Sequence, residues 1–252
     1  PAMGTVSGAG EYAEGKTATL TANANPGYKF VNWSNGSTDN PLKITVTEDI
    51  TLTATFQAQA PITIAEALVL EDGAACVLNP FTVVYVNGSY IYVEDASAYA
   101  LAYKYDYGLK AGDKVTGLAV TKSTHNDIAQ FVPASAYEDL TVVAGEAPAI
   151  VELTTAPTVA DNHLVKLMNV TMEGEFTTAA NATLVATCED ATTINIYNNK
   201  LNEYTFVAEK TYNITGGVTQ YKNVIQIQAY EIEEYVAPAP TTYTVTLLND
   251  AG

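Results

Sequence analysis

The sequence predicts an all-β protein, and three observations support this fold class. Runs of alternating apolar and polar residues recur about every ten residues, which is the period-two pattern of half-buried strands. Glycine, asparagine and aspartate, which favour turns, separate these runs. Threonine is frequent and there are 17 tyrosines, as is typical of strands. The one helical candidate is the segment 62–73, in which Thr63 and Glu66 have the spacing of a capping box.

Composition and charge limit the classes of partner. The 252 residues suffice for one large domain or two to three small ones, and 48% of them are hydrophobic, enough for a packed core. There are 28 acidic residues against 11 basic ones, all lysines, and the net charge is -17. This charge repels phosphate backbones. The chain also lacks arginine, the residue that most often forms paired hydrogen bonds to guanine. We therefore expect no nucleic-acid partner. We also expect no direct membrane insertion, because no run approaches the roughly 18 apolar residues of a membrane span.

The opening "PAMG" resembles the remnant of a cleaved tag, so residues 1–3 are interpreted as part of that tag. The first domain is therefore expected at residues 4–57. Alternation in "TATLTANA", "LKITV" and "TLTATF" predicts its strands, with a turn at Pro26-Gly27 and a break near Glu48-Asp49. The sole tryptophan, Trp33, is either an exposed ligand platform or a core anchor. We favour the anchor, since so small a domain needs its largest apolar side chain inside.

The first domain resembles a divergent internalin-B-type repeat of bacterial surface proteins. The resemblance covers about 50 residues and rests on the "EG" before the first long strand, the "GYKFVNW" core, the "NP" turn and the closing "TLTATF". It implies an extracellular or cell-surface location. Members of that family usually begin with one more strand of the kind "YTVT", which is missing here before Gly4.

A strand of that kind stands near the other end of the sequence, in "TTYTVTLLNDAG". Tyr243, Val245 and Leu247 alternate with threonines, so residues 238–252 are interpreted as a linker and the first strand of a following repeat. The first domain would then have an open sheet edge, and unpaired edges recruit strands. We expect residues 242–248 to pair with the first domain, most plausibly that of a neighbouring molecule, as head-to-tail self-association. Pairing within one chain would require the intervening domains to bring the two ends together.

A weak internal duplication spans residues 61–145 and 146–237. Glu94-Asp95-Ala96 matches Glu189-Asp190-Ala191, each between apolar strands, and Thr116-Gly117 matches Thr215-Gly216 further along. Five strands in about 90 residues suit an OB-like β-barrel, with the "EDA" in the hairpin turn between the second and third strands. The pair resembles the tandem OB-fold modules of secreted and surface lipoproteins of Bacteroidota. Residues 57–61, "QAQAP", are expected to be a linker.

The sequence predicts neither catalysis nor a cofactor. The histidines, His125 and His163, fall in different predicted domains, and no nucleophile elbow, phosphate-binding glycine loop or zinc-ligand spacing occurs. The neighbouring carboxylates at 94–95, 189–190 and 233–234 would point to opposite faces of a strand. Structural calcium is conceivable in so acidic a protein, but no EF-hand run is present, and no metal site is predicted. Cys76 and Cys188 lie in different predicted domains and are expected to be reduced and buried.

One row of aromatic residues in the first barrel invites a functional interpretation. The candidate ligand-binding residues are Tyr90, Tyr92, Tyr99, Tyr103 and Tyr105, which share a face if both strands persist. OB folds bind ligands on the surface of the second and third strands, although packing between tyrosines is the plainer explanation. The sequence therefore predicts a non-catalytic spacer and protein-interaction or adhesion segment of a modular surface protein, whose partner is a protein or a glycan. The alternative is a glycan-binding module that uses the tyrosine face.

Overall fold

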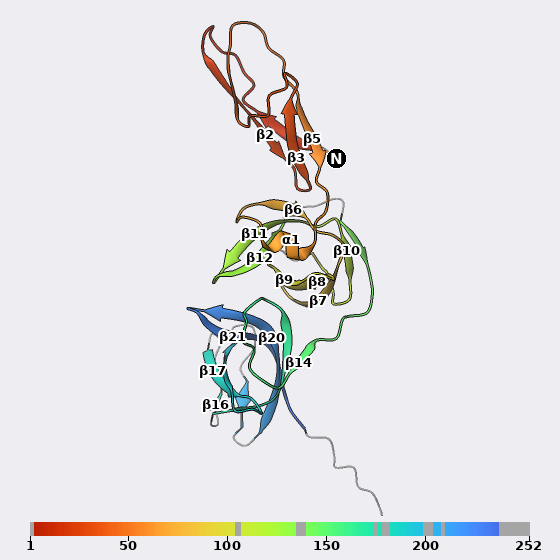
Figure 1. Ribbon diagram of the computed structural model, residues 1–252, viewed down its shortest axis with the longest axis vertical. Helices are drawn as coiled ribbons and strands as arrows, with labels where there is room; N and C mark the ends of the chain where they lie inside the picture. The colour runs from red at the N-terminus through yellow and green to blue at the C-terminus, as the bar shows by residue number, and fades with distance from the viewer. Residues whose placement is uncertain are drawn as a thin grey trace, which may run out of the picture.

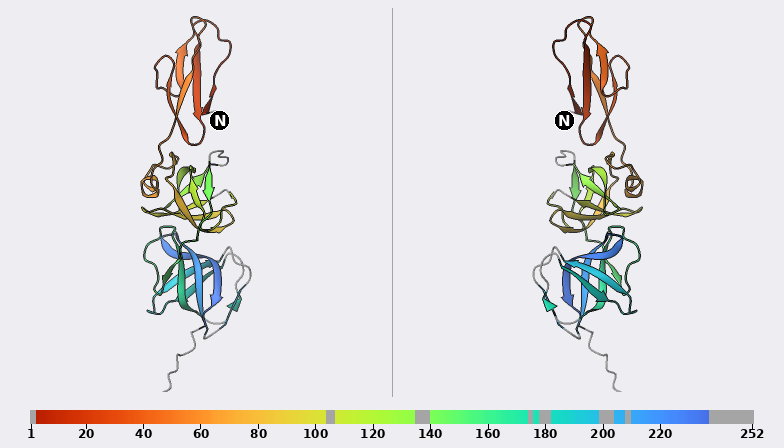
Figure 2. Two further views of the ribbon diagram at one scale, coloured as in Figure 1. Left: turned by 90° about the vertical axis from the view of Figure 1, so that its right-hand side faces the viewer. Right: turned by 90° about the vertical axis from the view of Figure 1, so that its left-hand side faces the viewer.

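The computed structural model describes residues 3–103, 107–134, 140–173, 176–177, 182–198, 204–207 and 210–236. Its strands fall into three groups that follow one another along the long axis (Figures 1 and 2). Strands dominate these residues and the only helix among them is one short segment, so the predicted all-β fold class is confirmed.

The N-terminal domain consists of two small sheets packed face to face. One has the order β1-β2-β4, from β1 (Gly4–Ser7), β2 (Thr17–Ala24) and β4 (Leu42–Thr45); the other pairs β3 (Tyr28–Trp33) with β5 (Ala54–Ala58). Trp33 is 2% exposed between them, and its Nε1 donates a hydrogen bond to the Asp39 carbonyl at 2.9 Å. The interpretation of Trp33 as the core anchor is confirmed.

Strand pairing in this domain shows where an open sheet edge lies, and the bounds of β5 correct two sequence-based expectations. β2 has a neighbour on each side, because it pairs with β4 and with β1, the latter from Gly4↔Ala24 onward. The sheet short of strands is instead β3–β5, which has only two strands in the described residues. β5 begins at Ala54 rather than near Leu52 and continues to Ala58. Gln57 pairs with Lys29 and Ala58 with Tyr28, so neither belongs to the expected linker.

The first barrel, residues 62–143, begins with helix α1 (Ile64–Leu68), whose capping box between Thr63 and Glu66 is present as predicted. Its strands are β6 (Ala75–Val77), β7 (Phe81–Asn87), β8 (Tyr90–Glu94), β9 (Tyr99–Tyr103), β10 (Lys114–Thr116), β11 (Ala119–His125), β12 (Ile128–Pro133) and β13 (Thr141–Val143). A β7-β8-β9 meander continues through β12, which runs parallel to β9, to β11. β10 pairs with β7 at the other end of this strand order, and only residues 117 and 118 separate β10 from β11, so these two strands close the sheet. β11 also pairs with β6, and the Leu78 amide donates to the Leu118 carbonyl at 3.0 Å.

The second barrel, residues 151–234, repeats this connection order. Its strands are β14 (Val151–Leu153), β15 (Leu164–Met172), β16 (Phe176–Thr177), β17 (Ala182–Thr187), β18 (Thr193–Asn198), β19 (Thr205–Phe206), β20 (Thr211–Tyr221) and β21 (Val224–Glu234). A β15-β17-β18 meander is followed by β21, which runs parallel to β18, and β20 closes the sheet against β15.

The duplicated sequence motifs lie at equivalent places in the two barrels. Asp95 is in the turn between β8 and β9, and Asp190 is in the turn between β17 and β18, where each accepts the backbone N–H two residues on. Gly117 separates β10 from β11, and Gly216 lies at a bulge within β20. Each glycine thus marks the bend that lets one long strand serve both sides of a closed sheet.

Each barrel has its own apolar core and one cysteine. Cys76 in β6 and Cys188 after β17 are both free and buried, which confirms the prediction. Burial raises the pKa of both thiols, so neither forms a thiolate readily.

Candidate functional site

The tyrosine face predicted for ligand binding lies against the second barrel. Along β8, Ile91 and Val93 point into the core of the first barrel while Tyr90 and Tyr92 point outward. Tyr92 is only 3% exposed, because it packs with Leu164 and Tyr230 of the second barrel. β8 is thus buried on both faces, which explains why residues 90–93 are all aromatic or aliphatic. The burial also removes Tyr92 from the predicted ligand-binding surface.

Two hydrogen bonds join the outward-facing tyrosines to β21. The Tyr92 and Tyr230 hydroxyls lie 2.7 Å apart, and the Tyr85 hydroxyl donates to Glu231 Oε1 at 2.7 Å. The Tyr230 ring also lies 5.9 Å from the Tyr90 ring and 5.7 Å from those of Tyr85 and Tyr92, within the range of favourable aromatic pairs. We call these residues, Tyr85, Tyr90, Tyr92, Tyr230 and Glu231, the tyrosine contact.

The remaining predicted ligand residues surround this contact. The Tyr103 ring lies 4.7 Å from the Tyr90 ring, and the Tyr99 ring lies 5.7 Å from His163 of the second barrel. Tyr99 and Tyr103 remain 43% and 37% exposed, so they are the part of the predicted face that solvent still reaches. Tyr105 lies outside the described residues. β9 ends at Tyr103, and Tyr107 packs against the barrel core instead of continuing the row.

A glycine in the second barrel makes room for Tyr92. A Cβ atom placed on Gly217 would meet the Tyr92 hydroxyl oxygen at 1.9 Å and its Cζ at 2.7 Å. Any side chain at position 217 would therefore displace Tyr92 or separate the barrels. The sequence analysis missed both Gly217 and Tyr230. The available signal was a pair of glycines in the middle of an apolar strand, which marks either a bulge or a close approach.

A second set of contacts fixes the orientation of the barrels. The Gln220 amide, near the tip of the β20–β21 hairpin, donates to the Asn126 carbonyl in the β11–β12 turn at 2.8 Å. The buried Asn162 amide donates to the Ala129 carbonyl of β12 at 3.2 Å. These bonds involve other parts of the two barrels than the tyrosine contact does. The two sets of contacts together therefore prevent the barrels from rotating relative to each other.

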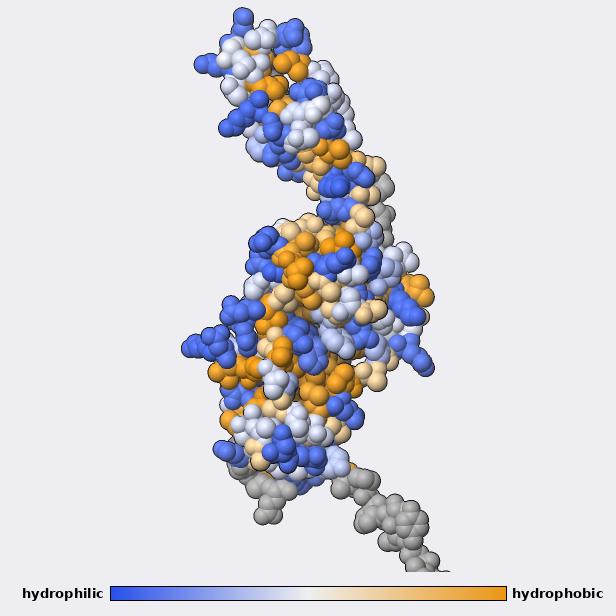
Figure 3. All heavy atoms as spheres, viewed as in Figure 1, coloured by the Kyte–Doolittle hydropathy of each residue, from blue (hydrophilic) through white to orange (hydrophobic). Residues whose placement is uncertain are grey.

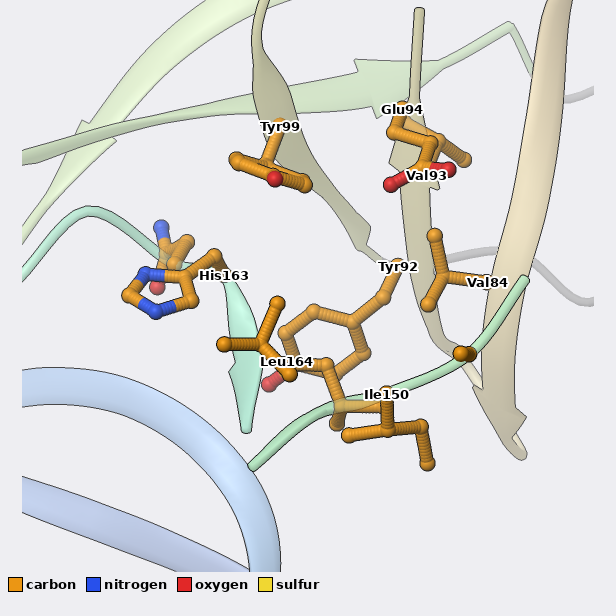
Figure 4. A pocket seen from close by; sticks show the side chains of 11 residues that line it. Val84, Tyr92, Val93, Glu94, Tyr99, Ile150, His163 and Leu164 are labelled. Atoms are coloured by element: carbon orange, nitrogen blue, oxygen red, sulfur yellow. The ribbon is translucent and has the colours of Figure 1, made fainter. Parts of the chain in front are cut away.

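The contact leaves no room for a ligand at its centre. Val84, Ile150 and Leu164 surround the Tyr92 ring, with Tyr99 and His163 to one side (Figure 4). The cavity among them is about 10 Å³, the space of one water molecule. Burial raises the pKa of Tyr92 and of Tyr230, so both hydroxyls stay protonated and hydrogen-bonded at neutral pH.

A much larger opening lies in the N-terminal domain, and we call it the N-terminal groove. Its volume is about 780 Å³. Its apolar lining comes from Leu20, Ile44, Ile50 and Leu52, with Trp33 beneath, and its acidic rim from Glu11, Glu48 and Asp49. Figure 3 shows hydrophobic atoms at the surface of this domain among hydrophilic ones. The sequence analysis did not predict the groove, because it forms between strands distant in the chain.

Comparison with known proteins bears on this domain alone. Residues 1–60 match the family model of the divergent InlB B-repeat domain. InlB-type repeats occur in bacterial surface proteins. The match supports the sequence resemblance for these 60 of the 252 residues. No curated protein and no solved structure matches the chain.

The ionisable groups that could support chemistry have separate structural partners. Glu233 pairs with Lys166 and accepts from the Asn213 amide, whereas Glu234 pairs with Lys210 at 2.6 Å, so the two carboxylates do not converge. His163 pairs with Asp161, while His125 lies on β11 of the other barrel. Among the described residues, no group of three or more histidine, cysteine or acidic side chains could hold a metal ion. None of the helices in the described part of the chain is long and apolar enough to cross a membrane.

Proposed function

We propose that this chain is a non-catalytic spacer segment of a modular bacterial surface protein, in which two OB-like barrels act as one stiff unit. The tyrosine contact is the observation that carries this proposal, because it uses the aromatic face that a binding module would present to its ligand. The strand order of each barrel, a meander followed by one parallel neighbour, supports the OB-like assignment. The InlB-type match at residues 1–60 supports a location on or outside the cell.

Small-angle X-ray scattering on the full chain tests the stiffness of this unit. The expected profile is that of an elongated particle with the barrels stacked as in Figure 1. The matched variant is Tyr92→Ala, which removes the ring at the centre of the contact while leaving the barrel cores intact. A profile of the unmodified chain that requires freely reorienting barrels would contradict the stiff-unit proposal.

A glycan-binding role has one observation in its favour, the exposure of Tyr99 and Tyr103 beside the contact. Sugar rings stack on exposed aromatic rings without needing a cation. A glycan-array screen of the unmodified chain and of Tyr99→Ala/Tyr103→Ala tests this role. Binding that is lost in the double variant would favour the glycan module over the simple spacer.

A further inference from the structure

The core of the N-terminal domain is incompletely covered. Its buried apolar residues are Ala18, Ala22, Trp33 and Leu42. Six further apolar residues packed around them are only partly buried, namely Leu20, Phe30, Ile44, Leu52, Ala54 and Phe56. Ile50, at the mouth of the N-terminal groove, is 45% exposed. The core of this domain is therefore open to solvent at the N-terminal groove, and a partner that covered the groove would bury further apolar surface.

An unpaired strand edge adjoins the same groove. Leu52, Ala54 and Phe56 all pack against the core, as one continuous strand would place them. Within the described part of the chain, however, β5 is paired only from Ala54 and only with β3. The residues just before β5, Ile50 to Leu52, line the groove. A strand laid along the free side of β5 would therefore gain backbone hydrogen bonds and cover the groove at the same time.

We propose that this groove binds residues 242–247 of a second copy of the chain, which add a strand to the free edge of β5. The segment Thr242–Leu247 alternates threonine with Tyr243, Val245 and Leu247, so one face is apolar and can fill the groove while the other stays in solvent. It carries no charged side chain. A neutral strand avoids the repulsion that an acidic segment would meet from Glu11, Glu48 and Asp49 at the rim.

The placement of the domains requires the strand to come from another molecule. The groove lies in the N-terminal domain, whereas the described chain leaves the second barrel at Val236, on the far side of both barrels (Figures 1 and 2). The intervening segment "APAPT", residues 237–241, spans only about 15 Å even if extended. That length suffices to carry the strand clear of its own barrel, but not past two barrels.

Such a contact joins two different surfaces, so it does not close on itself. Under this proposal each molecule offers its groove to one neighbour and residues 242–247 to another, so assembly continues as a linear chain. This inference does not depend on the spacer role, because it would hold equally for a ligand-binding segment.

The test uses two full-length variants with complementary defects. Val245→Asp/Leu247→Asp places charges on the apolar face of the strand, and Ile50→Asp places one in the groove at a partly exposed position. In analytical ultracentrifugation the unmodified chain should form dimers and larger species as its concentration rises. Each variant alone should associate at least about tenfold more weakly, since buried apolar anchors dominate such contacts. A mixture of the two should form one-to-one dimers and nothing larger, because only one functional groove and one functional strand remain.

The matched control is Thr244→Asp/Thr246→Asp, which adds the same charges on the opposite face of the strand. It should associate like the unmodified chain. Equal weakening by both double variants would overturn the proposal, because the effect would then come from charge alone. An unmodified chain that stays monomeric at millimolar concentration would also overturn it.

A peptide experiment separates binding from any folding defect in the variants. A synthetic peptide of residues 241–250 is added to Val245→Asp/Leu247→Asp, whose groove is unchanged. Trp33 is the sole tryptophan and lies under the groove, so its fluorescence reports on occupancy. The expected result is a saturable change in emission together with slower amide exchange at residues 50–58. A peptide carrying the same two aspartates should give neither, and no response to the unmodified peptide would refute strand addition.

Discussion

The fit between Tyr92 and Gly217 shows how single residues decide whether two barrels act as one. The phenol fills the space that the missing side chain leaves, and its hydroxyl then reaches Tyr230. Neither residue is unusual within its own barrel, where one is an outward strand residue and the other follows a bulge. Their importance becomes visible only across the contact.

Gly217→Ala should lower the free energy of unfolding by about 1–3 kcal/mol, the usual cost of forcing a methyl group into packed space. Chemical denaturation measures this change. Gly10→Ala is the matched control, because the nearest atom to its added Cβ is 3.9 Å away, and its effect should be small.

A double-mutant cycle tests whether the loss of stability in Gly217→Ala comes from the clash with Tyr92. In a Tyr92→Ala background, Gly217→Ala should cost much less, since the atoms it would strike are gone. If the two changes were simply additive, the strain would come from within β20 and not from the contact.

The cysteines give a second prediction at this scale. Both thiols are buried and free, and burial raises the pKa of each, so the folded protein should react slowly with iodoacetamide near neutral pH. Under denaturing, non-reducing conditions mass spectrometry should find two added labels. Finding none would mean that Cys76 and Cys188 are bridged.

At the scale of elements, Asp95 connects the turn between β8 and β9 to helix α1. Its carboxylate accepts hydrogen bonds from the Ile64 amide at 2.9 Å, the Ser97 amide at 2.7 Å and the Ala98 amide at 3.1 Å. Burial alone would raise the pKa of Asp95, but these bonds and one from the Ser97 hydroxyl outweigh it, and the pKa falls below its ordinary 3.8.

Because this pKa is lowered on folding, the stabilisation by Asp95 is fully present above the pKa of the unfolded chain and is lost as the pH falls through the folded value. Asp95→Asn should therefore destabilise the first barrel at pH 7 by about 1.5–3 kcal/mol, the usual contribution of a hydrogen bond to a charged group. The variant should also lose less stability than the unmodified chain between pH 5 and about pH 2. Thermal melts across that range measure both effects, and parallel pH profiles would contradict the role given to Asp95.

Local signals predicted most elements correctly, whereas pairing between distant strands was harder to foresee. The capping box at Thr63 and Glu66 and the turns at Asp95 and Asp190 depend on neighbouring residues. The two Thr-Gly pairs were recognised as a repeated motif, but the bends at Gly117 and Gly216 were not predicted. The tyrosine row was also recognised, but its role depends on Tyr230, more than a hundred residues away. The N-terminal groove likewise forms from strands whose side chains look ordinary one at a time.

For the whole molecule, the contacts predict two independent folding units. The tyrosine contact and the Gln220–Asn126 bond tie the barrels together, whereas the N-terminal domain is followed by a short segment whose Gln59 side chain donates to Ala75 at 3.3 Å. Calorimetry should therefore show the barrels unfolding in one transition, separate from loss of the N-terminal domain as followed by Trp33 fluorescence.

Tyr92→Ala should divide the barrel transition into two. Removing the ring leaves a gap in the contact while each barrel keeps its own core, so the coupling between the barrels is lost before their individual stability. A single barrel transition in this variant would show that the other contacts suffice to couple them.

The arrangement of the tyrosine contact also has a mechanical meaning. The barrels lie between the N-terminal domain and the exit of the chain at Val236, so tension applied across the molecule crosses the contact between them (Figure 1). The covalent connection there is the segment 144–150, between β13 and β14, and its residues are mostly exposed. Rings and hydroxyls can part while both closed sheets stay whole, and the same groups can meet again when the load is removed. Under tension, the tyrosine contact could therefore separate and form again without either barrel unfolding.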